Sequence, residues 1–441
     1  MRLPERGENQ VRIGVALAVP EPHGSRLQDA RAAFGDPLAS AIPPHVTLLG
    51  PTVVDVDDIA AVDDHLAEVG RAHRPFTVHL RGTGTFRPAE AGGPSMGEIK
   101  MKKFMAAAVA GFGFALAAAS AQAQAPQTLG QVKSRGILNC GSNTGLAGFG
   151  VPDAQGNWTG LDVDFCRAIA ATIFNDPTKV KFIPLSAKDR FTALQSGEVD
   201  VLVRNTTWTL SRDSQMGLIF AGVNYYDGQG FMVRKSLGIS SALELSGASV
   251  CVQTGTTTEL NLADYFRANG MQFNPVVFEK SDEVVQAYDA GRCDAFTTDA
   301  SGLYAERLKL TNPADHMVLP EIISKEPLGP VVRQGDDKWL TIVKWTHFAM
   351  LNAEEAGVTS ANVDEMKSSD NPDIKRLLGT EGTFGEPMGL SNDWAANVIK
   401  TVGNYGEVFD RNVGPDTPLG ISRGLNALWT KGGLQYGMPV R

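Results

Sequence analysis

Two short segments of this 441-residue sequence concentrate hydroxyl groups and charge. The segment TTWTLSRD (206–213) contains Arg212, whose guanidinium can bind a carboxylate through two parallel hydrogen bonds. The segment QTGTTTEL (253–260) is expected to begin a helix after the apolar run ASVCV, so its backbone N–H groups and threonine hydroxyls suit an anion. The hydroxyl groups belong to Thr206, Thr207, Thr209, Thr256, Thr257 and Thr258.

A carboxylate further along the chain, Asp299, supplies the opposite charge. Arg212 and the Thr257 amide would hold the carboxylate of an α-amino acid zwitterion, and Asp299 would hold its ammonium group. A surface ion-pair network with threonine-rich helix caps explains the same residues. The residues alone leave both interpretations open.

Two stretches around these residues repeat one pattern. RFTALQSGEVDVLVRNTTW (190–208) and EVVQAYDAGRCDAFTTDAS (283–301) each read as a helix, a glycine, an aspartate three residues later, a strand and a polar residue five positions beyond that aspartate. The polar residues are Asn205 and Asp299. Polar residues just beyond strand ends are where open α/β sheets bind ligands. The pattern favours two similar lobes facing a cleft, although a generic helix–strand junction has the same spacing.

The chain from Thr128 onward alternates strands with amphipathic helices. Residues 137–142 and 180–185 read as strands, and 160–174 as a helix with one apolar face. Asp162 and Asp164 lie near the start of that helix, where its dipole favours negative charge. This alternation predicts an α/β fold with mostly parallel sheets.

The composition limits the classes of function. The net charge of −9 argues against a nucleic-acid binder, which needs a basic surface. The four cysteines, Cys140, Cys166, Cys251 and Cys293, form no C-x-x-C pair and have no histidine nearby, so no zinc site, other metal or cofactor is predicted. Their even number suggests disulfides in an oxidising compartment; the alternative is four buried thiols.

Residues 100–123 have the composition of a secretory signal peptide. Lys100, Lys102 and Lys103 precede an uncharged run, and Ala121-Gln122-Ala123 forms a small-residue cleavage site. A retained membrane anchor is the alternative, since the apolar run approaches the length of a membrane span. The segment predicts export of the downstream part of the chain, with Met101 or Met96 as the natural start.

Residues 1–97 differ from the rest of the chain, with nine Arg and no Lys, Cys or Trp. They read as half of an α+β domain ending at residue 88, followed by a linker at 89–99. The expected strands are 11–20, 45–51 and 75–86, and the expected helices are 26–34 and 56–72. His45-Val46-Thr47 resembles the H-x-T motif of the two-histidine phosphoesterases, the RNA ligase-like family. These enzymes need two such motifs, and the sequence has one, so we expect a truncated, inactive and foreign fragment.

The exported part resembles the family 3 periplasmic solute-binding proteins. GLDVDFCRAIAATI (160–173) matches their typical pattern, and DRFTALQSGEVDVLVRNTTWTLSRD (189–213) and AGRCDAFTTDASGLYAERL (290–308) resemble the general L-amino-acid-binding proteins of polar amino-acid ABC transporters. The resemblance covers 128–441. It implies two α/β lobes, two hinge strands and a helical C-terminal extension. The first lobe would comprise 128–228 and 328–441, and the second 229–327.

The resemblance also implies residue roles. It assigns the carboxylate to Arg212, Thr207 and Thr257 and the ammonium to Asp299. The expected ligand-binding set is completed by Asn143, Asn205, Thr206 and Thr258. Relatives selective for cationic amino acids carry an acidic residue and an aromatic where this chain has Asn143 and Leu146, which argues for broad L-amino-acid binding with a polar bias. Because a bridge between lobes would block hinge motion, the lobe assignment implies the pairs Cys140–Cys166 and Cys251–Cys293.

The implied function is capture of a free L-amino acid in the Gram-negative periplasm and its delivery to the permease subunits of an ABC transporter. The protein is expected to be a monomer and not an enzyme. The alternatives are a dehydratase-like or murein hydrolase-like enzyme on the same scaffold, and a receptor sensor domain.

Overall fold

The computed structural model describes residues 10–18, 45–55 and 128–441, and the chain divides into two units, Met1–Ala115 and Leu116–Arg441. In the first unit, β1 (Gln10–Ala18) pairs antiparallel with β2 (His45–Asp55). These are two of the expected strands. The other elements expected before residue 100, and the signal-like segment 100–123, lie outside the described residues.

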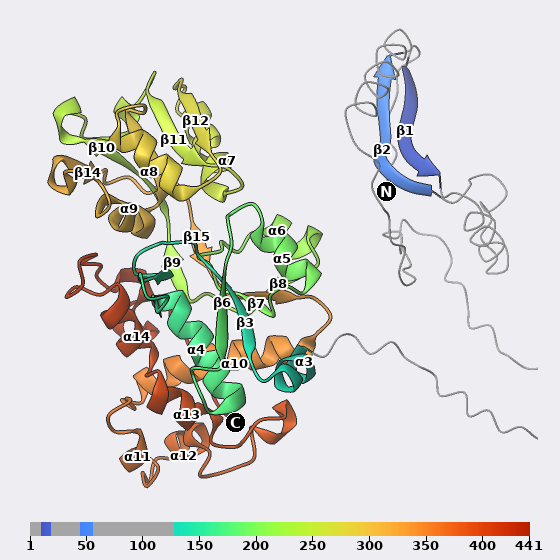
Figure 1. Ribbon diagram of the computed structural model, residues 1–441, viewed down its shortest axis with the longest axis vertical. Coiled ribbons are helices and arrows are strands. Elements are labelled where there is room, and N and C mark those ends of the chain that lie inside the picture. The colour runs from blue at the N-terminus through green and yellow to red at the C-terminus, as the bar shows by residue number, and fades with distance from the viewer. Residues whose placement is uncertain (1–9, 19–44, 56–127) are drawn as a thin grey trace, which may run out of the picture. The chain divides into compact units, whose positions relative to one another are not determined.

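The second unit contains two five-stranded sheets, each in its own lobe (Figure 1). The strand order in the first lobe is β6-β3-β7-β16-β8. The central strand β3 lies parallel to β6 and β7, whereas β16 runs antiparallel to β7 and β8. The strands are β3 (Leu138–Ser142), β6 (Val180–Pro184), β7 (Val201–Leu202), β8 (Leu218–Phe220) and β16 (Val331–Arg333). The helices of this lobe before the hinge are α3 (Thr128–Arg135), α4 (Leu161–Phe174), α5 (Arg190–Ser196) and α6 (Leu210–Gln215), and a small hairpin joins β4 (Val151–Pro152) to β5 (Trp158–Thr159).

The second lobe repeats this arrangement with the order β12-β11-β13-β10-β14. Its central strand β11 lies parallel to β12 and β13, and β10 runs antiparallel to β13 and β14. The strands are β10 (Gln229–Arg234), β11 (Ser249–Gln253), β12 (Asn274–Phe278), β13 (Ala295–Asp299) and β14 (His316–Val318). The helices are α7 (Thr257–Ala268), α8 (Ser281–Asp289) and α9 (Ala300–Arg307).

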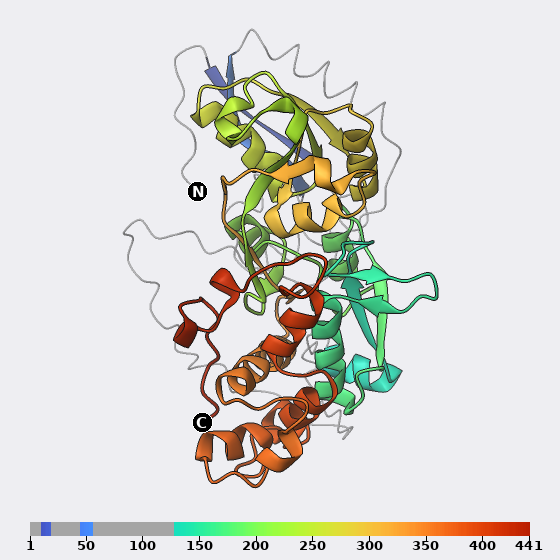
Figure 2. The same ribbon diagram turned by 90° about the vertical axis from the view of Figure 1, so that its left-hand side faces the viewer.

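Two hinge strands carry the chain between the lobes. The strand β9 (Tyr225–Asp227) follows β8 of the first sheet and precedes β10 of the second, while β15 (Glu326–Leu328) leads back from β14 to β16. They pair antiparallel with each other and lie between the two lobes in both ribbon views (Figures 1 and 2). The two-lobed fold expected from the resemblance is confirmed.

The repeated helix–glycine–aspartate pattern has a structural cause. Gly197 and Gly291 have φ angles of 82° and 80°, a left-handed conformation that glycine adopts without a Cβ clash and that ends each helix. Three residues later, Asp200 accepts a hydrogen bond from the backbone N–H of Asn139, and Asp294 accepts one from Ser249 N–H, both at 2.8 Å. Each aspartate therefore satisfies the backbone at the start of the neighbouring central strand.

Each lobe contains one disulfide bond. Cys140 on β3 bonds to Cys166 on α4, and Cys251 on β11 bonds to Cys293 just before β13. The bonds join the same pairs that the lobe assignment implied. Since both bridges lie within a lobe, neither restricts movement of one lobe against the other.

A helical layer comes after the second hinge strand and packs on the first lobe (Figure 2). Its helices are α10 (Asp337–Glu355), α11 (Val363–Met366), α12 (Pro372–Leu378), α13 (Trp394–Thr401) and α14 (Tyr405–Asn412). The Asp336 side chain caps α10, and the buried Trp339 donates its indole N–H to Asp200 O at 3.0 Å. The layer shares one hydrophobic core with β3 and α4.

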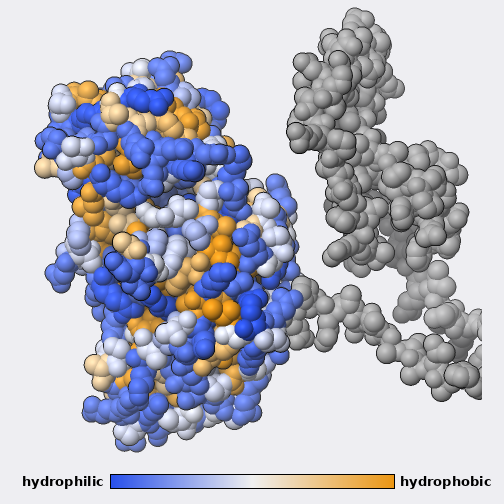
Figure 3. Space-filling view, viewed as in Figure 1, coloured by the Kyte–Doolittle hydropathy of each residue, from blue (hydrophilic) through white to orange (hydrophobic). Residues whose placement is uncertain are grey.

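The surface of residues 128–441 mixes hydrophilic and hydrophobic residues on the face visible in Figure 3. Within the described ranges, no helix combines the length and the apolar character needed to cross a bilayer.

Candidate ligand-binding site

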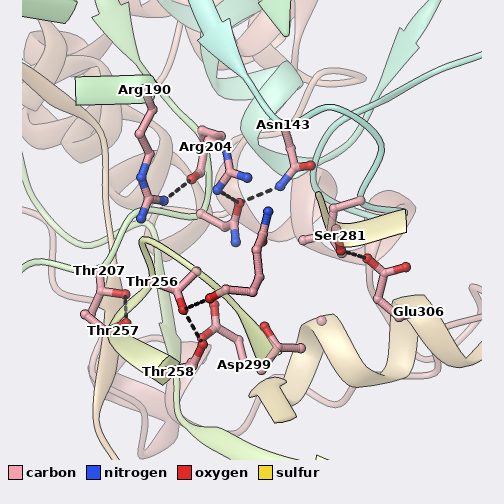
Figure 4. Close-up of a pocket in the computed structure, with 15 residues that line it drawn as sticks. Asn143, Arg190, Arg204, Thr207, Thr256, Thr257, Thr258, Ser281, Asp299 and Glu306 are labelled. Carbon is pink, nitrogen blue, oxygen red and sulfur yellow. Dashed lines mark hydrogen bonds between the residues drawn. The ribbon is translucent and has the colours of Figure 1, made fainter. Parts of the chain in front are cut away.

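A polar cavity lies between the two lobes (Figure 4). The first lobe contributes Asn143, Leu146, Arg190, Arg204, Asn205 and Thr207, and the second contributes Gln253, Thr256, Thr257, Thr258, Ser281, Thr298, Asp299, Gly302 and Glu306. Six of the eight predicted ligand-binding residues are among them. The other two, Arg212 and Thr206, are buried but do not line the cavity.

The carboxyl ends of parallel strands position the cavity. Asn143 follows β3, Asn205 lies beyond β7, and Asp299 is the last residue of β13. Because parallel strands end at the same edge of a sheet, polar residues far apart in sequence meet there. The cavity thus joins the ligand-binding edges of both sheets.

The buried carboxylate of Asp162 holds Asn205 in place. From the sequence we expected Asp162 only to interact with the dipole of the helix near whose start it lies. Asp162, at the start of α4, accepts hydrogen bonds from Asn205 N–H at 2.7 Å and from Asn224 Nδ2 at 3.0 Å. Burial raises the pKa of Asp162 to about 6. The Asn205 side-chain oxygen accepts from Asn143 Nδ2 at 2.8 Å, so these two amides form one wall of the cavity.

The threonine-rich segment begins α7, as its sequence predicts. Thr256 is the N-cap residue, and its hydroxyl oxygen accepts from Glu259 N–H at 3.1 Å. The same hydroxyl donates to Gln253 O at 2.7 Å and lies 2.9 Å from the hydroxyl of Thr258. Thr257 opens the helix, where free backbone N–H groups favour an anion.

Glu326, the first residue of β15, contacts a threonine of each lobe and was not predicted from the sequence. Its Oε2 accepts from the hydroxyls of Thr207 at 2.6 Å and Thr257 at 2.8 Å. Its Oε1 accepts from Asn261 Nδ2 at 2.7 Å and from the Ser324 hydroxyl at 2.7 Å. The one available signal was the acidic residue in ISKEPLGPVV (323–332), the segment that contains the second hinge strand β15.

Arg212 lies next to the cavity residue Thr207. One guanidinium nitrogen, Nη1, donates to Thr207 O at 2.8 Å, and the group stacks 5.1 Å from the centre of the Phe191 ring. Burial lowers the pKa of Arg212, whereas the charges of Glu326 and Asp299 act against that change. Its expected contact with a ligand carboxylate stays a prediction.

Asp299 carries the carboxylate expected to bind an ammonium group. Burial and the nearby carboxylates of Asp227 and Glu326 raise its pKa well above the usual value, while Arg190 and Arg212 oppose this shift. Burial also raises the pKa of Asp227 to about 6. Acidic groups of the second lobe and hinge therefore face arginines of the first lobe.

The lobes are in contact around the cavity. Lys188 Nζ of the first lobe lies 2.5 Å from Glu279 Oε1 of the second. Lys309 Nζ, from the second lobe, donates to Gly145 O of the first at 2.8 Å. The structure is therefore a closed arrangement of the lobes. Within the described ranges, no group of three or more metal-ligating side chains is placed to hold a metal ion.

Two α/β lobes, two hinge strands and a polar cavity between the lobes define the class of two-lobed ligand-binding proteins. The chain belongs to the bacterial extracellular solute-binding proteins, family 3, whose model matches residues 138–357. Residues 19–118 match the 2'-5' RNA ligase superfamily, in agreement with the H-x-T resemblance.

The chain is similar to several characterised relatives. It is 67% identical to the general L-amino acid-binding periplasmic protein AapJ of Rhizobium johnstonii, over 71% of this chain and 93% of the relative. It is 59% identical to the glutamate/glutamine/aspartate/asparagine-binding protein BztA of Rhodobacter capsulatus, over 71% and 93%. A solved ABC transporter periplasmic binding protein from Brucella ovis, with glutathione bound, is 67% identical, with a TM-score of 0.71 over 71% of this chain and 99% of that one.

Proposed function

We propose that this protein captures a free L-amino acid in the periplasm and delivers it to the permease of an ABC transporter. The observation that carries the proposal is the cavity itself, in which the Asp299 carboxylate and the N-terminus of α7 lie on the second-lobe side, across from arginines of the first lobe. An α-amino acid zwitterion needs one group of each sign. The names of the relatives, AapJ and BztA, support the same ligand class.

Closure of the lobes is the proposed signal to the permease. A ligand held by both lobes stabilises the closed form, because only that form makes both sets of contacts. We propose that the protein acts as a monomer and uses no cofactor.

A thermal-shift screen of the purified protein against the twenty amino acids and glutathione tests the proposal. A ligand that binds only the native state must raise the melting temperature. We expect shifts with several polar L-amino acids and none with their D-enantiomers. No shift with any amino acid would overturn the proposal.

We further propose that the protein is not an enzyme. His45 lies in the one H-x-T motif of the sequence, and general acid–base chemistry of this type needs a second histidine. Mass spectrometry of bound amino acids after prolonged incubation, and an assay with 2',5'-linked oligonucleotides, should detect no product. Product formation that disappears in His45→Ala would assign an activity to the first unit.

Export through residues 100–123 is part of this proposal. Cleavage after Ala123 would release the binding protein with Gln124 as its first residue. N-terminal sequencing of the native periplasmic protein should find Gln124. Recovery of the whole chain from the membrane fraction would favour an anchor instead.

A further inference from the structure

The last part of the chain, dark red in Figure 1, bonds to the first hinge strand. Within the described part of the chain, β9 and β15 form a two-stranded sheet, so the outer edge of β9 has no strand beside it. The side chain of Asn426, in the short 3₁₀ helix η6 (Gly424–Asn426), takes the place of a strand at this edge. Its Oδ1 accepts from Tyr226 N–H at 2.7 Å, and its Nδ2 donates to Tyr226 O at 3.0 Å. One buried amide thus satisfies both backbone groups of Tyr226.

Arg423 fixes Asn426 to the helical layer. Its Nε and Nη2 both donate to Asn426 O at 3.1 Å, and Nη2 also donates to Glu354 Oε2 on α10 at 2.9 Å. The same guanidinium lies 5.1 Å from the centre of the Tyr405 ring and 4.9 Å from that of Phe409, both on α14. Because α10 and α14 share a hydrophobic core with the first lobe, Asn426 ties β9 to that lobe.

Three more buried side chains from this part of the chain hold the backbone that leads into β9. Val223 O accepts from His347 Nε2 at 3.1 Å and from Gln435 Nε2 at 3.3 Å. Asn224 O accepts from the Tyr405 hydroxyl at 2.8 Å. Each of the three donors belongs to a residue that is 2% exposed. The segment before the hinge strand is therefore attached to the first lobe as firmly as Tyr226 itself.

The contacts of the hinge strand change lobe directly after Tyr226. The Asp227 carboxylate accepts from Ser301 N–H at 3.3 Å and from the Ser301 hydroxyl, and Gly228 O accepts from Ala300 N–H at 2.8 Å. Ala300 and Ser301 begin α9 of the second lobe. The bonds to the helical layer therefore end at Tyr226, and the bonds to α9 begin at Asp227.

We propose that the helical layer and C-terminal segment confine the bend of the first hinge strand to the Tyr226–Asp227 junction, with Asn426 as the main positioning residue. This inference rests on the proposed function, because it concerns the closure of the lobes. A hinge bends at the few residues whose φ and ψ change. Residues 223–226 cannot supply this change without losing their bonds to the helical layer. Asn426 does not line the cavity, so it acts on ligand capture only through the hinge.

The test measures the distribution of distances between the lobes by pulsed electron paramagnetic resonance. Spin labels are attached at Lys181→Cys on β6 and Arg267→Cys on α7, two exposed positions in different lobes. The four native cysteines form disulfides, so only the introduced cysteines react with the label. Each protein is measured without ligand and with saturating L-glutamate.

Asn426→Ala removes both bonds to Tyr226, and Asn352→Ala is the matched control. Asn352 also bonds to the C-terminal segment, donating to Met438 O at 2.7 Å, but not to the hinge. Without ligand, we expect the distance distribution of Asn426→Ala to be about twice as wide as that of the wild type, because more residues can bend, and that of Asn352→Ala to be unchanged. With glutamate, all three proteins should show the same closed distance.

Tyr405→Phe, which removes one hydroxyl and keeps the buried ring, provides a second test if Asn426→Ala does not fold. It should widen the distribution in the same direction but less. Distributions as narrow as that of the wild type in both variants would overturn the proposal, and so would equal widening in Asn352→Ala. Failure of the proposed function looks different, because glutamate would then leave the wild-type distances unchanged while the ligand-free comparison still holds.

Discussion

Thr207 of the first lobe and Thr257 of the second face each other with their hydroxyl oxygens 3.3 Å apart, and both donate to the same oxygen of Glu326. One hinge carboxylate thus joins a group from each lobe. This three-residue contact connects the two lobes directly through a hinge residue.

Removal of this contact should weaken the closed form. We expect Thr257→Val to raise the ligand dissociation rate about tenfold, because the variant loses a hydrogen bond to a charged group worth about 1.5–3 kcal/mol and keeps the side-chain shape. Stopped-flow displacement of bound amino acid measures this rate. Thr192→Val, at an exposed threonine of α5, is the control and should release ligand at the wild-type rate. An unchanged rate in Thr257→Val would contradict a role of the contact in closure.

Arg212 is predicted to bind the α-carboxylate that all ligands share. Arg212→Met should therefore weaken every amino acid to a similar extent, by about 100-fold or more, since a buried carboxylate loses its charged partner. Calorimetry with glutamate and norvaline, which differ in their side chains, measures whether the loss is uniform. Near-wild-type binding by Arg212→Met would move the α-carboxylate to one of the arginines that line the cavity.

The buried His347 should make stability depend on pH. Burial lowers its pKa to about 4, from about 6.5 in an unfolded chain. Below pH 6.5 His347 is protonated in the unfolded chain, whereas in the folded protein it stays neutral down to about pH 4. The stability of the folded protein therefore falls as the pH falls from 6.5 to 4. When the pH is lowered from 7.5 to 5.0, this histidine should reduce the free energy of unfolding by about 2 kcal/mol.

Urea unfolding of the wild-type protein and of His347→Gln at both pH values measures the contribution of His347 to the pH dependence of stability. The loss on acidification should be about 2 kcal/mol smaller in the variant. Asp162, whose pKa is raised, favours the folded state at acid pH in both proteins, so its effect cancels in the comparison. Identical pH dependence of the two proteins would be incompatible with a neutral buried His347.

Each disulfide should stabilise its own lobe. The bonds close loops of 26 and 42 residues, for which the chain-entropy estimate is about 3–4 kcal/mol each. Reduction should lower the melting temperature without abolishing ligand binding below it, because no cysteine lines the cavity. Thermal unfolding with and without reductant, in the paired variants Cys140→Ala/Cys166→Ala and Cys251→Ala/Cys293→Ala, assigns the effect to a lobe. Unchanged melting in both pairs would argue against this role.

Local patterns in the sequence determined the helices and strands, and they indicated the strand ends beyond which candidate ligand-binding residues lie. The glycine and aspartate spacing predicted two similar helix–strand junctions, because a left-handed glycine and a carboxylate that receives a backbone N–H are local requirements. The threonine-rich start of α7 was likewise evident, since helix capping involves residues only three positions apart. The resemblance to a family added the lobe assignment and the disulfide pairs.

The tertiary structure decided which charged groups meet. Glu326 contacts Thr207 across 119 positions, and Asp162 contacts Asn205 across 43, and no local rule predicts either pair. Arg190 and Arg204 were overlooked as cavity residues, because no local pattern around either residue indicates that it lines the cavity and is only 3% exposed. The hinge strands bring the lobes together, so these side chains share one cavity wall with residues that lie far away in the sequence.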